Sequence, residues 1–148
     1  MNLLFVCSGN TCRSPMAEAL ARKIAQRRGI KDLNVSSAGT NAWDNATATD
    51  EALLVGMERE VDLTSHRSRK LTPAIVSEAD LIFVMTPGHV EQVKQLGGRG
   101  KVHVIDEYAS GTPNQGITDP YGGDLEAYRH TADVLEKELE KLFDRLGN

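Results

Sequence analysis

Short apolar segments alternate with helix-like segments along this chain, and this alternation constrains its fold more than any other feature. The apolar segments are typical of buried strands, and they lie at residues 2–6, 33–39, 79–85 and 101–105. The helix-like segments follow them, from about residue 14, at 49–60, at 87–96 and beyond 123. Strands that alternate with helices predict an α/β fold, a three-layer sandwich whose parallel sheet has helices on both faces.

The first predicted helix directly follows the first strand and its loop. Met16, Leu20 and Ile24 recur at intervals of four residues, which gives the segment one apolar face. We expect Ser14 to cap the start of this helix and Pro15 to take its first helical position. A strand that leads through a short loop into a helix places that loop at the carboxyl end of the sheet, where parallel sheets bind ligands.

The last predicted helix has apolar residues separated by four or three positions. They are Tyr128, Ala132, Leu135, Leu139, Leu142 and Leu146. The same spacing occurs in coiled coils, but a single helix of this length more often packs within its own molecule. We therefore expect it to pack on the chain's own sheet.

The size and composition of the chain favour one cytoplasmic domain, residues 1–148, with no Pro- or Ser-rich linker and no internal repeat. The formal net charge of -4 argues against general binding to nucleic acid. No apolar run approaches the roughly 18 residues of a transmembrane helix, and no signal peptide is recognisable, so we expect no membrane contact. Two neighbouring cysteines fit a reducing compartment, and nothing demands more than a monomer.

The stretch "FVCSGNTCRSP", residues 5–15, holds both cysteines and predicts an anion site. A loop that enters a helix directs several backbone N–H groups at one point, where the helix adds positive charge. Gly9 allows a backbone conformation that a side chain would resist, and Arg13 offers a planar fork for two phosphate oxygens. The same field favours a thiolate at Cys7, so the loop predicts phosphoryl transfer through a cysteinyl-phosphate.

Other interpretations of the two cysteines are weaker. A cysteine after a strand is often a small buried apolar residue, and Cys7 with Cys12 could form a redox pair or half of a metal site. A structural zinc site needs four ligands, and the chain has no third cysteine. The glycine patterns of nucleotide-binding loops are also missing. We expect no metal and no cofactor.

The string "VCSGNTCRSPMAEAL" resembles the low-molecular-weight protein tyrosine phosphatase family, whose signature is C-x5-R-[ST] near the N-terminus. A second family element, "DPYGG", lies at 119–123 before the last helix. The resemblance implies Cys7 as nucleophile, Arg13 as phosphate ligand and Asp119 as proton donor. It also implies a four-stranded parallel sheet, with the phosphate-binding loop after the first strand.

The same resemblance assigns roles to further residues. It implies that Ser14 hydrogen-bonds the thiolate, that Asn10 braces the loop, and that Ser37 and His66 belong to the bracing network. The loop residues that would surround the bound phosphate or similar oxyanion are Ser8, Gly9, Asn10, Thr11, Cys12 and Ser14. The partners it implies are phosphorylated proteins.

Thr11 bears on which phosphorylated group is hydrolysed. Tyrosine-directed members usually carry an apolar residue here, and threonine looks like the mark of protein arginine phosphatases within the family. A guanidinium needs acceptors for its N–H groups, which Thr11 and Asp119 offer, whereas a phenyl ring prefers apolar walls such as Trp43 could form. We rank a phosphoarginine phosphatase first and a tyrosine phosphatase second. Arsenate reduction is third because it normally needs a third cysteine, and a non-catalytic phosphoprotein-binding module would leave Asp119 unexplained.

Three further expectations concern residues outside this core set. Cys12 either merely packs or pairs with Cys7 on oxidation, and we favour the redox role. The segment "RSRK", 67–70, is expected to be a solvated turn, with a substrate-docking patch as the alternative. The remaining histidines, His89, His103 and His130, are expected in solvated or helix-end positions.

Overall fold

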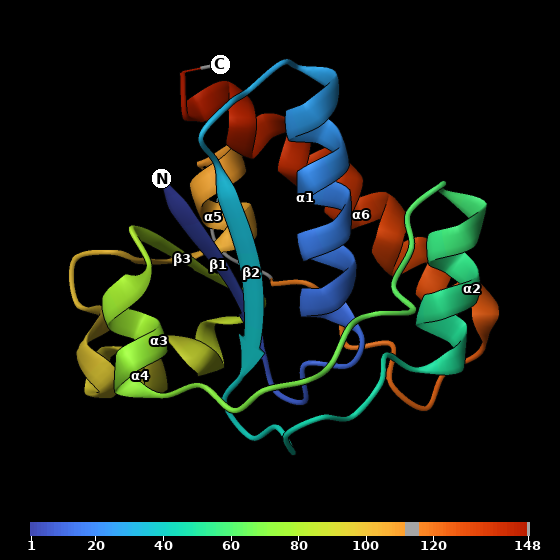
Figure 1. Cartoon of the computed structure of the whole chain (residues 1–148), viewed down its shortest axis with the longest axis horizontal. Coiled ribbons are helices and arrows are strands. Elements are labelled where there is room, and N and C mark those ends of the chain that lie inside the picture. Colours follow the sequence, from blue (N-terminus) through green and yellow to red (C-terminus); the bar gives the residue numbers. More distant parts are fainter. Residues whose placement is uncertain (112–115, 148) are drawn as a thin grey trace.

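The computed structural model describes residues 1–111 and 116–147, and its centre is a four-stranded parallel sheet (Figure 1). The strands are β1 Asn2–Cys7, β2 Asn34–Gly39, β3 Leu81–Val84 and β4 Val102–Val104. Their order in the sheet is β2-β1-β3-β4, so β1 and β3 lie in the middle. The predicted α/β fold and four-stranded parallel sheet are confirmed, because long apolar runs are what a sheet covered on both faces requires.

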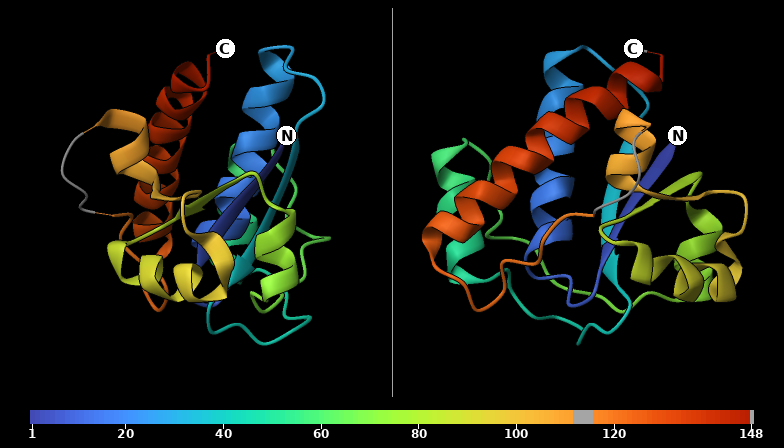
Figure 2. Two further views of the ribbon diagram at one scale, coloured as in Figure 1. Left: turned by 90° about the vertical axis from the view of Figure 1, so that its left-hand side faces the viewer. Right: turned by 180° about the vertical axis from the view of Figure 1, so that it is seen from behind.

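Helices cover both faces of this sheet. They are α1 Arg13–Arg27, α2 Asp50–Glu58, α3 Pro73–Glu78, the 3-10 turn η1 Pro87–His89, α4 Val90–Val93, the π-helical turn η2 Lys94–Gly98, α5 Ile105–Ser110 and α6 Leu125–Arg145. Leu3 and Phe5 of β1 face the side of α1, α5 and α6, while Leu4 and Val6 face the side of α3 and α4 (Figure 2). The alternation of side chains along β1 thus divides the core into two layers.

Helix α6 packs within the molecule, as expected, and not as a coiled coil. Its buried residues are Tyr128, Thr131, Ala132, Leu135, Leu139, Leu142 and Phe143. They meet α1 and α5, which themselves lie on the sheet, and α2 packs against the outer part of α6 (Figure 2). None of the helices in residues 1–111 and 116–147 combines the length and the apolar composition needed to cross a membrane.

The helices differ in three local details from what the sequence predicts. Ser14 does not cap α1, because the helix begins at Arg13 with Cys12 at the cap position, and the Ser14 hydroxyl bonds to the Cys7 sulfur instead. The predicted helix at 87–96 is confirmed as a continuous helical segment over residues 87–98, but its winding changes from 3-10 to α and then to π, with Gly97 at a φ of 105°. Helices α3 and α5 were not predicted, since one face of a six-residue helix shows too little periodicity.

Candidate active site

Cys7 is the last residue of β1, and residues 8–12 form the loop that leads into α1 at Arg13. The loop therefore lies at the carboxyl end of a central strand, the end at which open parallel sheets bind their ligands. Cys7 is 3% exposed, Asn10 0% and Arg13 4%. Polar and ionisable side chains buried to this degree need partners, and each of them has some.

The sulfur of Cys7 lies between two hydrogen-bond donors. The Asn10 N–H points at Sγ from 3.3 Å, and the Ser14 hydroxyl lies 2.9 Å from the same sulfur. The Ser14 oxygen also accepts an N–H from the Asn10 side chain at 2.8 Å, so its own proton is available to the sulfur. Two donors directed at one sulfur atom stabilise a negative charge there.

Asn10 is the point at which the loop is anchored. Its side chain donates to Ser14 and, at 2.9 Å, to Ser37 Oγ, and it accepts the backbone N–H of Arg69 at 3.0 Å. Its φ is +57°, a left-handed conformation that asparagine tolerates better than most residues. The flexibility assigned to Gly9 was the wrong explanation, because Gly9 does not have a positive φ and Asn10 makes the turn.

The two residues expected to brace the loop both reach Asn10. His66 Nε2 lies 2.7 Å from the Asn10 carbonyl oxygen, and because a carbonyl only accepts, this nitrogen carries the proton. Ser37 accepts from Asn10 and donates to Glu18 Oε1 at 2.6 Å. Glu18 was not predicted as a site residue, although its position on α1, one helical turn after Ser14, places it beside the loop and was a usable signal.

Arg13 links the loop to the segment that carries Asp119. Its Nη1 donates to the Ile117 carbonyl at 2.9 Å, and its Nη2 lies 3.5 Å from Asp119 Oδ2. The Asp119 side chain is half-exposed, and its other oxygen accepts the Tyr121 N–H at 3.0 Å. A carboxyl group open to solvent thus stands beside the guanidinium at the entrance to the loop.

His89 is a further site residue, and of its two expected positions, solvated or at a helix end, the second is confirmed, because it is the last residue of η1. It is 6% exposed, with Nε2 2.9 Å from Ser8 Oγ and Nδ1 3.1 Å from Thr86 Oγ1. Burial, and then the nearby charge of Arg13, lower the pKa of His89, against a smaller opposing effect of Asp119. No signal within 87–89 predicted this contact, which exists because neighbouring strands end side by side. His130 is exposed and His103 half-buried, the latter beside Tyr108.

Thr11 and Cys12 occupy the side of the loop nearest α6. Cys12 is 5% exposed, and its sulfur lies 3.5 Å from the Tyr128 hydroxyl and 3.8 Å from Thr11 Oγ1. Burial raises the pKa of the Cys12 thiol and also raises the pKa of Tyr128. Thr11 is only partly buried, so its hydroxyl can face the entrance of the site. Both cysteines are free.

A hollow of about 470 Å³ opens over Cys7. It is lined by Cys7, Ser8, Gly9, Thr11, Cys12, Arg13, Asn41, Trp43, Ala46, Asp119 and Tyr121. Trp43 and Tyr121 are 86% and 71% exposed, so these aromatic rings stand at the rim. Trp43 is therefore near the site, as one interpretation expected, but much more exposed than a half-buried tryptophan.

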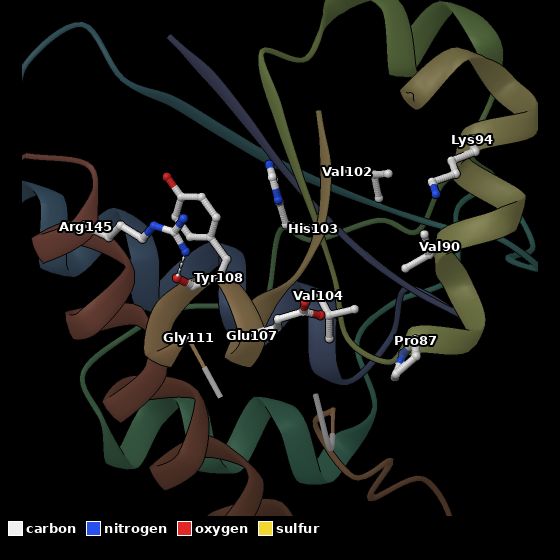
Figure 3. A pocket seen from close by; sticks show the side chains of 10 residues that line it. All are labelled: Pro87, Val90, Lys94, Val102, His103, Val104, Glu107, Tyr108, Gly111 and Arg145. Atoms are coloured by element: carbon white, nitrogen blue, oxygen red, sulfur yellow. Dashed lines mark hydrogen bonds between the residues drawn. The ribbon is translucent and has the colours of Figure 1, made fainter. Parts of the chain in front are cut away.

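A larger hollow, of about 580 Å³, lies at the free edge of the sheet (Figure 3). Val102, His103 and Val104 of β4 line it between the walls formed by α4 and α5, and Arg145 covers the Tyr108 ring at 4.2 Å. No cysteine is among its lining residues in the described chain. Within residues 1–111 and 116–147, no three His, Cys, Asp or Glu side chains are grouped as metal ligands. The hollow over Cys7, with its converging donors, is the candidate active site.

Comparison with known proteins agrees with this choice. The family model described as low molecular weight phosphotyrosine protein phosphatase matches residues 2–148, and the chain belongs to this family. It is 41% identical to a Bacillus subtilis (strain 168) protein named protein-arginine-phosphatase, over 99% of this chain and 97% of that one. It is 35% identical to a low molecular weight phosphotyrosine protein phosphatase of Schizosaccharomyces pombe, over 86% of this chain and 85% of the relative.

A solved structure gives the same match in three dimensions. It is described as YwlE arginine phosphatase, a "C7S mutant with phosphorylated active site serine". The TM-score is 0.94 at 41% sequence identity, and the match covers 100% of this chain and 97% of the other. The fold is therefore shared over the whole length of both chains.

Proposed function

We propose that this protein is a cysteine-dependent phosphatase that hydrolyses phosphoarginine in proteins through a phosphocysteine intermediate. The observation that carries the proposal is the Cys7 sulfur at the floor of the loop, with two donors directed at it and with Arg13 and Asp119 paired above. The family to which the chain belongs supports this reaction, and so does the name of its Bacillus subtilis relative.

In the first step the Cys7 thiolate attacks phosphorus, and the bond between phosphorus and the leaving nitrogen breaks. Asp119 gives its proton to that nitrogen, which departs as an NH2 group of the arginine side chain, and the phosphoryl group stays on sulfur. In the second step Asp119 takes a proton from the water that attacks phosphorus. The bond between sulfur and phosphorus then breaks, which restores the thiolate and releases phosphate.

The loop stabilises the charge that develops on three phosphoryl oxygens in the transition state. Backbone N–H groups of residues 8–13 and the Arg13 guanidinium supply most of this stabilisation. The fixed position of Asn10 matters here, because donors held in place in advance need no reorganisation during the reaction. Removal of one such donor typically costs about 100-fold or more in kcat.

The preference for phosphoarginine rests on polar groups around the entrance. Thr11 presents an oxygen where an apolar residue would present only a hydrocarbon surface, and the Asp119 carboxylate is half-exposed nearby. Both can accept N–H bonds from a substrate guanidinium. Sites that satisfy polar groups of the substrate discriminate more sharply than apolar pockets do.

The second candidate is a protein tyrosine phosphatase of the same family. The observation that favours it is the pair of exposed rings, Trp43 and Tyr121, at the rim of the hollow. Such rings could hold a phenyl group from two sides. The catalytic steps would be the same, with a phenolic oxygen as the leaving atom.

The test compares the hydrolysis of one peptide sequence that carries phosphoarginine with the same sequence that carries phosphotyrosine. We expect the wild type to prefer phosphoarginine, and Thr11→Ile to shift the ratio of the two kcat/KM values toward phosphotyrosine. Cys7→Ser should abolish turnover of both peptides. A wild-type preference for phosphotyrosine would contradict the substrate assignment alone, whereas turnover by Cys7→Ser would contradict the whole mechanism.

Oxidation is proposed to regulate the same site. Peroxide would take two protons and two electrons from Cys7 and Cys12, giving a disulfide and water. Four residues separate these buried thiols along a tight loop, and the pairing would protect Cys7 from irreversible oxidation. We further propose that the chain works as one monomeric, cytoplasmic domain on phosphorylated proteins.

A further inference from the structure

A third hollow lies next to the active-site loop. It measures about 330 Å³ and is lined by Pro15, Glu18, Ala19, Arg22, Ser37, Asp62, Leu63, Ser65, His66, Arg67 and Arg69. It shares no lining residue with the hollow over Cys7. Its outer wall is the segment 62–69, which passes the start of α1 and reaches the end of β2 (Figure 1).

Positive charge exceeds negative charge around this hollow. Arg22, Arg67 and Arg69 face two carboxylates, and both carboxylates are already occupied by neighbouring groups. Glu18 accepts from Arg22 at 2.7 Å and from Ser37 at 2.6 Å. Asp62 accepts the backbone N–H and the hydroxyl of Thr64, which lower its pKa.

Two of the three arginines keep donors for a ligand. Arg67 donates Nη1 to the carbonyl oxygens of Thr64 and His66, and Arg69 donates Nε to the Ser37 carbonyl. In the described part of the chain, neither guanidinium forms an ion pair, and the Arg69 Nη atoms have no hydrogen-bond partner.

We propose that this hollow is a second anion site, which binds a divalent tetrahedral oxyanion between Arg67 and Arg69. Planar guanidinium forks match the oxygens of such an anion, and two forks from one turn can contact separate edges of it. The "RSRK" segment, whose Arg67 and Arg69 line the hollow while Ser68 is buried, is then neither a merely solvated turn nor a docking patch for the substrate, but part of the wall of this site.

The site is connected to the active-site loop through Asn10. His66 donates to the Asn10 carbonyl, and the Arg69 backbone N–H donates to the Asn10 side chain. An anion bound by Arg69 therefore acts on the residue that anchors the loop. By thermodynamic linkage, if this anion changes the affinity of the active-site loop for phosphate by some factor, phosphate in the loop changes the affinity for this anion by the same factor.

The test is an NMR titration of the ¹⁵N-labelled protein with sodium sulfate, against sodium chloride at equal ionic strength. The backbone amides of Ser65 and His66 report on the proposed site, and those of residues 8–12 report on the active-site loop. We expect saturable shifts at both places. In Arg13→Ala the loop signals should respond more weakly, while those of Ser65 and His66 keep their wild-type affinity.

Two charge-matched variants decide the assignment. Arg67→Gln should weaken sulfate binding at Ser65 and His66 roughly tenfold, the loss expected when one charge-assisted hydrogen bond is removed. Arg99→Gln, which removes an exposed guanidinium elsewhere, should change it by less than about twofold. Shifts that do not saturate, or equal losses in the two variants, would overturn the proposal. The readout needs no turnover, so it is independent of the proposed reaction.

Discussion

Asn10 is the residue whose replacement best tests the account of the loop. Its amide serves Ser14, Ser37 and the Arg69 N–H, and its backbone is left-handed. Ser14 and Ser37 keep other partners, but Arg69 loses its acceptor, so we expect Asn10→Gly to lower the unfolding free energy by about 3 kcal/mol. Asn10→Ala should lose about 1 kcal/mol more, because alanine resists the left-handed conformation.

The assay is urea unfolding followed by far-UV circular dichroism, since Trp43 is too exposed to report on the core by fluorescence. Asn45 supplies the matched control. It is also left-handed, at φ 69°, but exposed, so Asn45→Gly should be nearly neutral and Asn45→Ala should cost about 1 kcal/mol. If Asn10→Gly keeps stability within about 1 kcal/mol and leaves kcat/KM unchanged, the network does not hold the loop.

Three further outcomes are expected. The pKa of buried His89 is lowered in the folded protein, so below pH 6.5 the unfolded chain binds this proton more readily and the free energy of unfolding falls. His89→Gln should make that fall less steep. Equal pH dependence of the unfolding free energy in the variant and the wild type would contradict this. Cys12→Ser should recover less activity than wild type when thiols follow peroxide, and unchanged recovery would exclude the disulfide. Gly39→Ala would place a methyl group 2.5 Å from the Ser8 carbonyl oxygen, which is too close, and should therefore lower kcat/KM. Gly88→Ala is the control, because the nearest atom to its methyl group would be 3.8 Å away. Equal kcat/KM values for the two variants would show that Gly39 is not needed for the shape of the loop.

The parts of the fold that depend on local pattern were predictable. The strands lie within about two residues of the predicted segments, because a short continuous apolar run is typical of a strand that is buried on both faces of a sheet. The loop from Cys7 to Arg13 was recognisable because the nucleophile and the phosphate-binding groups all lie within seven consecutive residues. Asp119 was found only through the family resemblance, since an Asp-Pro pair by itself usually marks a turn.

The contacts that hold the loop were mostly out of reach. The bond from Arg69 to Asn10 joins residues 59 positions apart, and that between Ser8 and His89 spans 81 positions. Such pairs meet only because parallel strands bring their following loops to one edge, and neither partner has a local signal. Ser37 and His66 were named from the resemblance, and Glu18 had an unused signal in its spacing from Ser14, whereas His89 needed three-dimensional positions.

The bond from Arg13 to the Ile117 carbonyl has a consequence for the resting enzyme. Of the five N–H donors of this guanidinium, one serves the Ile117 carbonyl and Nη2 lies 3.5 Å from Asp119, so a phosphoryl oxygen that takes the first of these hydrogens frees that carbonyl. Such an exchange in the proposed reaction would release residues 117–119, which carry the acid, from the phosphate-binding loop. Substitutions at Ile117 or Thr118 would then change turnover without altering any side chain that touches phosphorus.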